Sequence, residues 1–308
     1  MTEPLNRSLA VPLTHWGVIR AHGADAAKFL HGQLTQDVLQ LGRSQARIAG
    51  YCSAKGRLLA SFVLWKTSDD EVLLACHTSV LAATLKRLSM FVMRAQCKLT
   101  DATDEISLQG LTGDRAAGET EGLPAWGKRD DAQGAWIRLP DVDGLARAWR
   151  VTSAASALAA DPVALRAWQQ LEIDSGIVTI EAATVDQFVP QMLNFELIGA
   201  VNFQKGCYPG QEVVARSQYR GTAKRRTFLF SCDEPIAAGQ EVFHSADPEQ
   251  PAGMVAGAVQ SVDARSYRAL VEVKLAALAC GSLHLGAVDG ALLTPRPLPY
   301  EVPVAEAA

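Results

Sequence analysis

The chain has 308 residues, 48% of them hydrophobic and 20% charged, and its 29 basic and 33 acidic side chains give a net charge of −4. This composition excludes an intrinsically disordered chain, which needs low apolar content and high net charge. It also disfavours a DNA-coating protein, because such proteins attract phosphates through a basic excess. The chain lacks an apolar run of roughly 18 residues and a signal-peptide pattern at its start. We therefore expect a cytoplasmic protein with no membrane and no DNA partner.

The cysteines are too few for a disulfide scaffold in a chain of this length. None of them forms a C-x-x-C pair, and the spacings match no ferredoxin pattern. We therefore expect no stably bound metal ion or iron–sulfur cluster, and we interpret most of these thiols as small core residues. The six are Cys52, Cys76, Cys97, Cys207, Cys232 and Cys280.

The first part of the chain alternates predicted helices and strands. Apolar residues recur three to four apart over 24–41 and predict an amphipathic helix that ends at Gly42. Strand-like runs follow at Ala46–Cys52, at 56–65 and at Glu71–His77, and Thr78 or Ser79 then caps a second helix. This mixture of strands and helices with short connections predicts an α+β architecture.

The middle of the chain carries weaker signals. Ile106 and Leu108 alternate with polar neighbours and predict a half-buried strand. The stretch 112–133 is polar and glycine-rich, so we expect a surface loop there. Asp161 followed by Pro162 predicts a helix start, and that helix continues to Gly176 with Trp168 on its core face.

The last third changes in character. Short strand-like runs at 227–232, 240–244, 253–261 and 267–273 are separated by proline, glycine and aspartate, which predicts a small β-barrel or sandwich. We place the boundary near 222–227. The proline-rich end predicts a loose tail.

The segment 202–221 carries the densest unusual chemistry. Gly206 and Gly210 permit tight backbone geometry around Cys207, and Pro209 suits the first turn of a helix. A helix N-terminus and the nearby Lys205 would both favour the thiolate of Cys207. A glycine-containing hinge with a helix cap and a solvated basic face is the alternative interpretation.

The residues Lys205 to Glu212, KGCYPGQE, resemble the signature of the YgfZ-type folate-binding proteins. These are relatives of the glycine-cleavage T-protein, an aminomethyltransferase, and they assist iron–sulfur cluster assembly. The resemblance extends over most of the chain and is weakest at 112–160. Further similar segments are FLHGQLTQDV at 29–38, AKGR at 54–57, VPQMLNFE at 189–196, and VAR, YRG and KRR between 214 and 226.

The resemblance implies a T-protein-like arrangement of three domains around a central cavity that accepts tetrahydrofolate. Two intertwined α+β domains would lie in residues 1–222, and a β-barrel in residues 223–308. Cys207 would be the functional thiol, beside Lys205. The implied signature residues are Gly206, Tyr208, Gly210, Gln211 and Glu212.

The same resemblance implies a set of folate-binding residues. Glu172 resembles the T-protein glutamate that holds the pterin ring, and an exposed helix carboxylate is its alternative interpretation. Asn194 belongs to the implied folate site. Arg216 and Arg225 suit the anionic glutamate tail of the folate, or they pair with Glu212. His15 lies near the N-terminus without metal-ligand spacing, so we expect a surface or cap role for it. His77 closes a predicted strand before a helix.

One departure from the T-protein concerns catalysis. The T-protein has an aspartate after its glycine-rich hairpin that is tied to aminomethyl transfer, and here Ala60 stands at that place with Ser61 beside it. Neither side chain supplies a carboxylate that could act near neutral pH. We therefore do not expect a conventional aminomethyltransferase.

Three functions remain open at this stage. The first is a tetrahydrofolate-binding accessory protein that supports assembly or repair of iron–sulfur clusters in client enzymes, including radical-SAM tRNA-modifying enzymes. Its partners would be reduced folate and iron–sulfur client or assembly proteins. The second is a folate-dependent one-carbon transferase or demethylase, in which Cys207 is structural. The third is a binding module that takes no folate.

Overall fold

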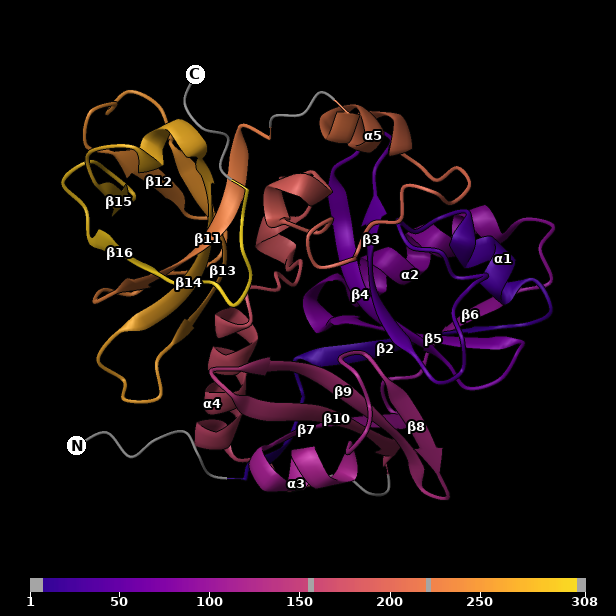
Figure 1. Cartoon of the computed structure of the whole chain (residues 1–308). Helices are drawn as coiled ribbons and strands as arrows, with labels where there is room; N and C mark the ends of the chain where they lie inside the picture. The colour runs from indigo at the N-terminus through magenta and orange to yellow at the C-terminus, as the bar shows by residue number, and fades with distance from the viewer. Residues whose placement is uncertain (1–7, 155–157, 220–222, 304–308) are drawn as a thin grey trace.

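Three bodies of β-structure make up the computed structural model, which describes residues 8–154, 158–219 and 223–303. Two are five-stranded sheets, and the third is a closed six-stranded barrel at the C-terminal end (Figure 1). The predicted α+β class with a C-terminal β-barrel is therefore confirmed. None of the described helices is long and apolar enough to cross a membrane.

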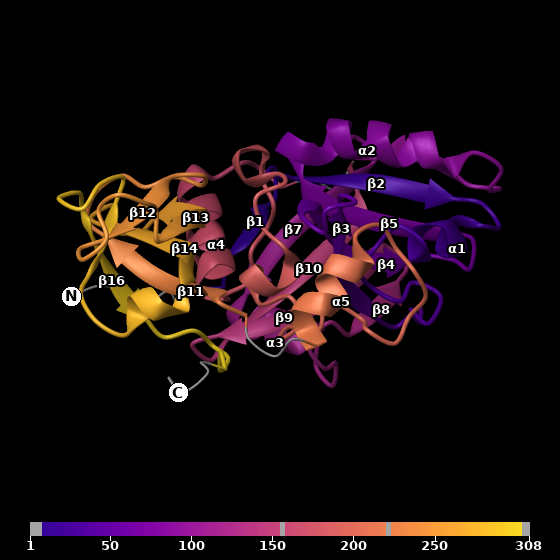
Figure 2. The same cartoon turned by 90° about the horizontal axis from the view of Figure 1, so that it is seen from above.

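The first sheet is antiparallel, with strand order β3-β4-β5-β2-β6. Helix α2 (Thr78–Val92) covers one face of it and buries Val80, Leu81 and Leu88 there (Figure 2). The sequence predicts Thr78 or Ser79 as the cap, but the cap is His77, one residue earlier. The Nδ1 atom of His77 accepts a hydrogen bond from the backbone N–H of Ser79, and the helix begins at Thr78. The strands are β2 (Trp16–His22), β3 (Ala46–Cys52), β4 (Leu58–Lys66), β5 (Glu71–His77) and β6 (Lys98–Asp101).

The predicted helix over 24–41 is wrong beyond its first turns. Helix α1 spans only Ala26–His31. The chain then runs beside β3, where the backbone N–H of Thr35 donates to Gly50 and Leu34 bridges to Tyr51. The apolar residues after the helix are buried as the periodicity requires, but a run of bends and turns rather than a helix buries them.

The second sheet is also antiparallel, with strand order β1-β7-β10-β9-β8. Its edge strand β1 precedes the whole first sheet in the chain. The backbone therefore passes from the second sheet to the first and then returns to the second. The strands are β1 (Ala10–Pro12), β7 (Ile106–Thr112), β8 (Lys128–Asp131), β9 (Gly134–Val142) and β10 (Leu145–Ser153).

The expected surface loop over 112–133 is wrong. It contains helix α3 (Gly113–Glu119) and strand β8. Ala116 of the helix packs on Trp136 and Ala148 of the sheet. The side chain of Lys128 is fully buried, and its ammonium donates to Asp130 and to the carbonyl of Arg43. Strand β8 has a polar sequence, which is typical of a loop, because its one buried side chain is a paired lysine.

Helix α4 (Pro162–Asp174) lies between the second sheet and the barrel (Figure 1). The carboxylate of Asp161 accepts from Val163 and Ala164, as the predicted start requires. Trp168 is fully buried, as expected, and packs directly on Gly110. The chain then passes through the short helices η2 (Ala182–Thr184) and η3 (Pro190–Leu193) to α5 (Gln211–Tyr219).

The barrel has the strand order β11-β14-β13-β12-β15-β16. The sequence predicts its first four strands but not the last two. The expected loose tail is wrong up to Tyr300, because β16 pairs with β11 and the Tyr300 hydroxyl donates to the carbonyl of Gly176 at 2.7 Å. The strands are β11 (Arg225–Cys232), β12 (Glu241–His244), β13 (Gly253–Gln260), β14 (Tyr267–Lys274), β15 (Leu283–Leu285) and β16 (Leu292–Arg296), with η4 (Leu275–Leu278) before β15.

The turn between β3 and β4 touches the segment that leads into α5. A Cβ atom on Gly210 would lie 2.4 Å from the carbonyl oxygen of Ser53, and one on Gly56 would lie 2.8 Å from Val213. Both glycines have positive φ, of 79° and 73° respectively. Only glycine allows this backbone conformation and this approach together.

Replacing Gly210 by alanine should therefore lower the free energy of unfolding strongly. Gly199→Ala is the matched control, because Gly199 has φ +71° but nothing within 4 Å of its Cβ position. We expect the control to lose about 1–2 kcal/mol of unfolding free energy through backbone strain. Gly210→Ala should lose about 1–3 kcal/mol more, because a steric clash adds to that strain. Urea denaturation measures both, and equal losses would contradict a close approach at Gly210.

Candidate functional site

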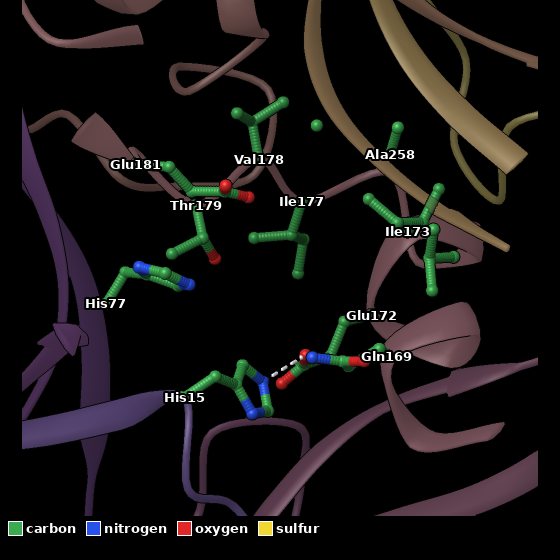
Figure 3. Close-up of a pocket in the computed structure, with 12 residues that line it drawn as sticks. His15, His77, Gln169, Glu172, Ile173, Ile177, Val178, Thr179, Glu181 and Ala258 are labelled. Carbon is green, nitrogen blue, oxygen red and sulfur yellow. Dashed lines mark hydrogen bonds and ion pairs between the residues drawn. The ribbon is translucent and has the colours of Figure 1, made fainter. Parts of the chain in front are cut away.

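A cavity of about 170 Å³ lies where the first sheet, α4 and the barrel meet. His15 reaches it from the turn before β2, and His77 from the end of β5. Glu172 comes from α4, and Glu181 from the segment after it. Ile173, Ile177, Val178, Ala258 and Val259 supply apolar walls. Figure 3 shows the His15–Glu172 pair in the lower part of the view, with His77 at the left and Glu181 above it.

Glu172 accepts three side-chain hydrogen bonds. Its Oε1 atom accepts from the indole nitrogens of Trp16 at 2.9 Å and Trp168 at 2.8 Å. Its Oε2 atom lies 2.7 Å from Nε2 of His15. The carboxylate side chain is only 22% exposed, so the interpretation as an exposed helix carboxylate is wrong. Two donors satisfy Oε1, and Oε2 retains one acceptor position.

The His15–Glu172 pair is an ion pair in a poorly solvated place. Burial alone would raise the pKa of Glu172, but the charge of His15 and the three hydrogen bonds hold that pKa below its ordinary value. Burial alone would lower the pKa of His15, but the charge and hydrogen bond of Glu172 hold it above 6.5. The pair therefore contributes its full stability only at a pH above the ordinary pKa of Glu172, near 4.5. This contribution is lost as the pH rises through the raised pKa of His15.

His77 and Glu181 are the other titratable groups of the cavity. Nδ1 of His77 accepts from the backbone N–H of Ser79, so the proton of the neutral ring lies on Nε2. Burial and the charge of His15 lower the pKa of His77 below 6.5, although Glu172 opposes them. Burial raises the pKa of Glu181, with Glu172 adding to this and His15 opposing it. The cavity thus combines hydrogen-bond donors and acceptors around apolar walls.

Of this group, only Glu172 is indicated by the sequence. His77 closes β5 as the sequence predicts, and a surface or cap role is expected for His15, but neither expectation places them in the cavity that both line. No spacing in the sequence relates residues 15, 77, 172 and 181. Only the fold brings a turn, a strand end and a helix together here.

The signature segment lies elsewhere, against α1. Lys205 is 8% exposed, and its ammonium donates to the backbone carbonyls of His31 and Leu34, the latter at 2.9 Å. It also lies 4.8 Å from the ring centroid of Tyr208. Burial lowers the pKa of Lys205 to about 8, although Asp37 and Cys207 oppose this. Lys205 therefore holds the signature segment onto the end of α1.

Cys207 is exposed, but it is not at a helix N-terminus as predicted. Helix α5 begins at Gln211, after Gly210, so the thiol precedes the helix by four residues. The influence of a helix dipole falls off within one turn. Cys280 is also exposed and Cys97 half-buried, so only Cys52, Cys76 and Cys232 are buried as expected.

The other predicted folate-binding residues lie away from the central cavity. Asn194 is fully buried, and its amide nitrogen donates to the carbonyl of Thr227 and to the Tyr300 hydroxyl. Arg216 and Arg225 line a second cavity, next to α5, and Nη1 of Arg225 donates to both oxygens of Glu272. Arg216 makes no ion pair with Glu212 among the described residues. Whether these residues bind folate stays a prediction.

The position of the T-protein aspartate also has a structural setting. Ala60 is fully buried in β4, opposite Tyr51. The hydroxyl of Ser61 accepts from the backbone N–H of Ile180, between two residues of the cavity wall. Within the described ranges, no three His, Cys, Asp or Glu side chains are grouped to hold a metal ion.

The class of protein follows from the fold. The crystal structure of the glycine cleavage system aminomethyltransferase T from Bartonella henselae matches 96% of this chain and 87% of its own, with a TM-score of 0.73. Its sequence identity is 16%, so the match establishes the fold alone. The chain therefore has the aminomethyltransferase T fold.

Sequence comparison identifies the family. The tRNA-modifying protein YgfZ of Enterobacter sp. (strain 638) is 30% identical over 95% of this chain and 93% of its own length. The tRNA-modifying protein YgfZ of Shigella boydii serotype 4 (strain Sb227) is 32% identical over 73% of each chain. No family model matches the chain. The chain belongs to the YgfZ family.

The two cavity histidines should titrate on opposite sides of pH 6.5. We expect His15 to titrate above this value and His77 below it, measured by NMR from the imidazole Cε1–H shifts. In Glu172→Gln, His15 loses its counter-charge while remaining buried, so its pKa should fall below 6.5. A His15 pKa that does not change in this variant would contradict the ion pair.

Proposed function

We propose that this protein binds a reduced folate in the central cavity and supports iron–sulfur enzymes that modify tRNA. Membership of the YgfZ family carries the proposal, since its curated relatives are named as tRNA-modifying proteins. The aminomethyltransferase T fold and the cavity between its domains support it. On this account the protein acts as an accessory factor, and its partners are client or assembly proteins of iron–sulfur clusters.

The cavity residues fit the pterin end of a folate. A pterin ring is flat and presents N–H donors at its edge. The acceptor position left on Oε2 of Glu172 and the carboxylate of Glu181 can accept them, while Ile173 and Ile177 flank the ring. At about 170 Å³ the cavity encloses a ring rather than a whole drug-sized molecule, so the remainder of a folate would extend outside it.

A folate-dependent one-carbon transferase or demethylase is the second candidate. The observation that favours it is the acid–base group of His15, His77 and Glu181 in the cavity. Against it, Ala60 and Ser61 supply no carboxylate at the position of the T-protein aspartate. Incubation with tetrahydrofolate and methylamine donors separates the two, because only the enzyme forms methylene- or methyl-folate.

Calorimetric titration with 5-formyltetrahydrofolate, a stable reduced folate, tests the binding. We expect Glu181→Gln and Glu172→Gln each to weaken binding about tenfold or more, because each removes a charged acceptor. The exposed Glu249→Gln is the matched control and should bind as the wild type does. The absence of binding heat at millimolar folate would contradict the proposal, and so would an equal loss of folate affinity in the control variant.

The role of the thiol is tested in a bacterial strain from which the strain's own YgfZ-family protein has been deleted. Variants of the present protein are expressed in that strain. We expect Cys207→Ser to lose most of the activity of a radical-SAM tRNA-modifying enzyme in that strain. Cys280→Ser changes the other exposed cysteine and should retain that activity. Full activity with Cys207→Ser would show that the thiol has no part in the function.

A further inference from the structure

The C-terminal end of α2 exposes a group of large apolar side chains. Met90 is 61% exposed, Phe91 46% and Met93 85%. Leu88, on the other face of the helix, is buried against the first sheet. Figure 2 shows α2 on the outside of that sheet, along one margin of the molecule. Large apolar side chains that are exposed singly are normal, but a contiguous group of them marks an interaction site.

Cations lie beside these apolar side chains. Lys86 and Arg87 are exposed one helical turn before Met90 and Phe91, so the four residues share one side of the helix. The guanidinium carbon of Arg87 lies 5.9 Å from the ring centroid of Phe91. Arg94, just after the helix, is also exposed. We call these three cations and the three exposed apolar residues the α2 tip.

The positive charge of the α2 tip is not offset by ion pairs. Within the described ranges, none of its three cations lies within ion-pair distance of a carboxylate. The sequence has no Asp or Glu in α2 or in the turn after it. Asp25, before α1, approaches that turn, but its carboxylate accepts the backbone N–H of Gln96 at 2.8 Å. The tip is therefore locally basic on a chain whose net charge is −4.

The backbone of Met93 is an independent observation. The carbonyl of Val92 accepts from the backbone N–H of Ala95 at 2.8 Å, so a β-turn follows the helix directly. Met93 is the first central residue of this turn, with φ 41° and ψ −100°. These angles are close to those of a type II′ turn, in which glycine is the usual residue at this position. A methionine strains this backbone and gains no burial in return, so the fold itself gives no reason for it.

We propose that the α2 tip is a docking surface for an acidic, amphipathic helix of a partner protein. The three apolar side chains contact the apolar face of that helix, and the three cations pair with its carboxylates. Methionine, aromatic and arginine side chains are enriched at protein interfaces, and methionine adapts to varied apolar shapes. A second copy of this chain is a poor occupant, because its own tip carries the same charge. The proposal does not depend on folate binding in the central cavity.

Two other classes of occupant fit the α2 tip less well. Proteins that recognise anionic membranes typically use clusters of about four to eight basic residues, and the tip has three. RNA phosphates would pair with the cations but would leave the side chains of Met90 and Met93 in water. An acidic amphipathic helix uses the charge and the apolar surface together.

Fluorescence anisotropy on the full chain, with a labelled helical peptide of about 18 residues, tests the surface. The peptide carries leucine and phenylalanine at i, i+3, i+4 and i+7 and glutamate at most other positions. One control peptide has lysine in place of every glutamate, and another has serine in place of every apolar residue. Phosphatidylserine vesicles and bulk tRNA are tested alongside as the other occupants.

Three variants of the full chain separate docking from stability. Met93→Gly removes an apolar contact but relieves the backbone strain, so it should not destabilise the fold. Lys86→Glu/Arg94→Glu reverses two charges of the α2 tip. Arg115→Glu/Arg265→Glu is its matched control, because both of these arginines are exposed and lie outside the tip.

We expect the acidic peptide to bind saturably and about tenfold or more tighter than either control peptide. Its affinity should fall about fivefold in Met93→Gly, with an unchanged or higher urea midpoint, and about tenfold or more in Lys86→Glu/Arg94→Glu. The control Arg115→Glu/Arg265→Glu should bind the peptide as the wild type does.

Three results would overturn this docking surface. The first is that the acidic peptide shows no saturable binding, or binds no better than the control peptides. The second is an equal loss of affinity in Arg115→Glu/Arg265→Glu, or an unchanged affinity in Met93→Gly. The third is binding of the vesicles or the tRNA, but not of the peptide, that Lys86→Glu/Arg94→Glu abolishes, since this would assign the tip to a membrane or to RNA.

Discussion

The carboxylate of Glu172 is the interaction on which the arrangement of the domains depends. It joins α4 to the start of β2 through Trp16 and His15, and to its own helix through Trp168. A carboxylate so poorly solvated is stable only because three donors and the charge of His15 replace water. The same hydrogen bonds hold the start of the first sheet against α4 at one side of the central cavity. The contact that joins the first sheet to α4 therefore also forms one side of the candidate site.

A second set of contacts makes the signature segment rigid. Lys205 binds the carbonyls at the end of α1, and Gly210 touches the turn that contains Gly56. Two motifs about 150 residues apart in sequence thus form one surface, on which Cys207 is exposed. Helix α5 follows directly and forms a wall of the second cavity. The signature therefore has a structural role in addition to its thiol.

The sequence predicts those parts of the fold that local patterns determine. Continuous apolar runs identify β3 and β5, and Asp161 with Pro162 identifies the start of α4. Patterns fail where tertiary contacts decide, as with the bends and turns after His31 and the buried Lys128. In the site, the family resemblance identifies Glu172. His15 and His77 remain hidden, because only the folded chain brings a turn and a strand end to α4.

A crystal structure of the protein with 5-formyltetrahydrofolate is the most direct test of the central claim, that the cavity at Glu172 is the folate site. We expect the pterin ring between Ile173 and Ile177, with its N–H edge toward Glu172 and Glu181. Folate density in the cavity beside Arg216, or none at Glu172 under conditions where calorimetry shows binding, would contradict the claim.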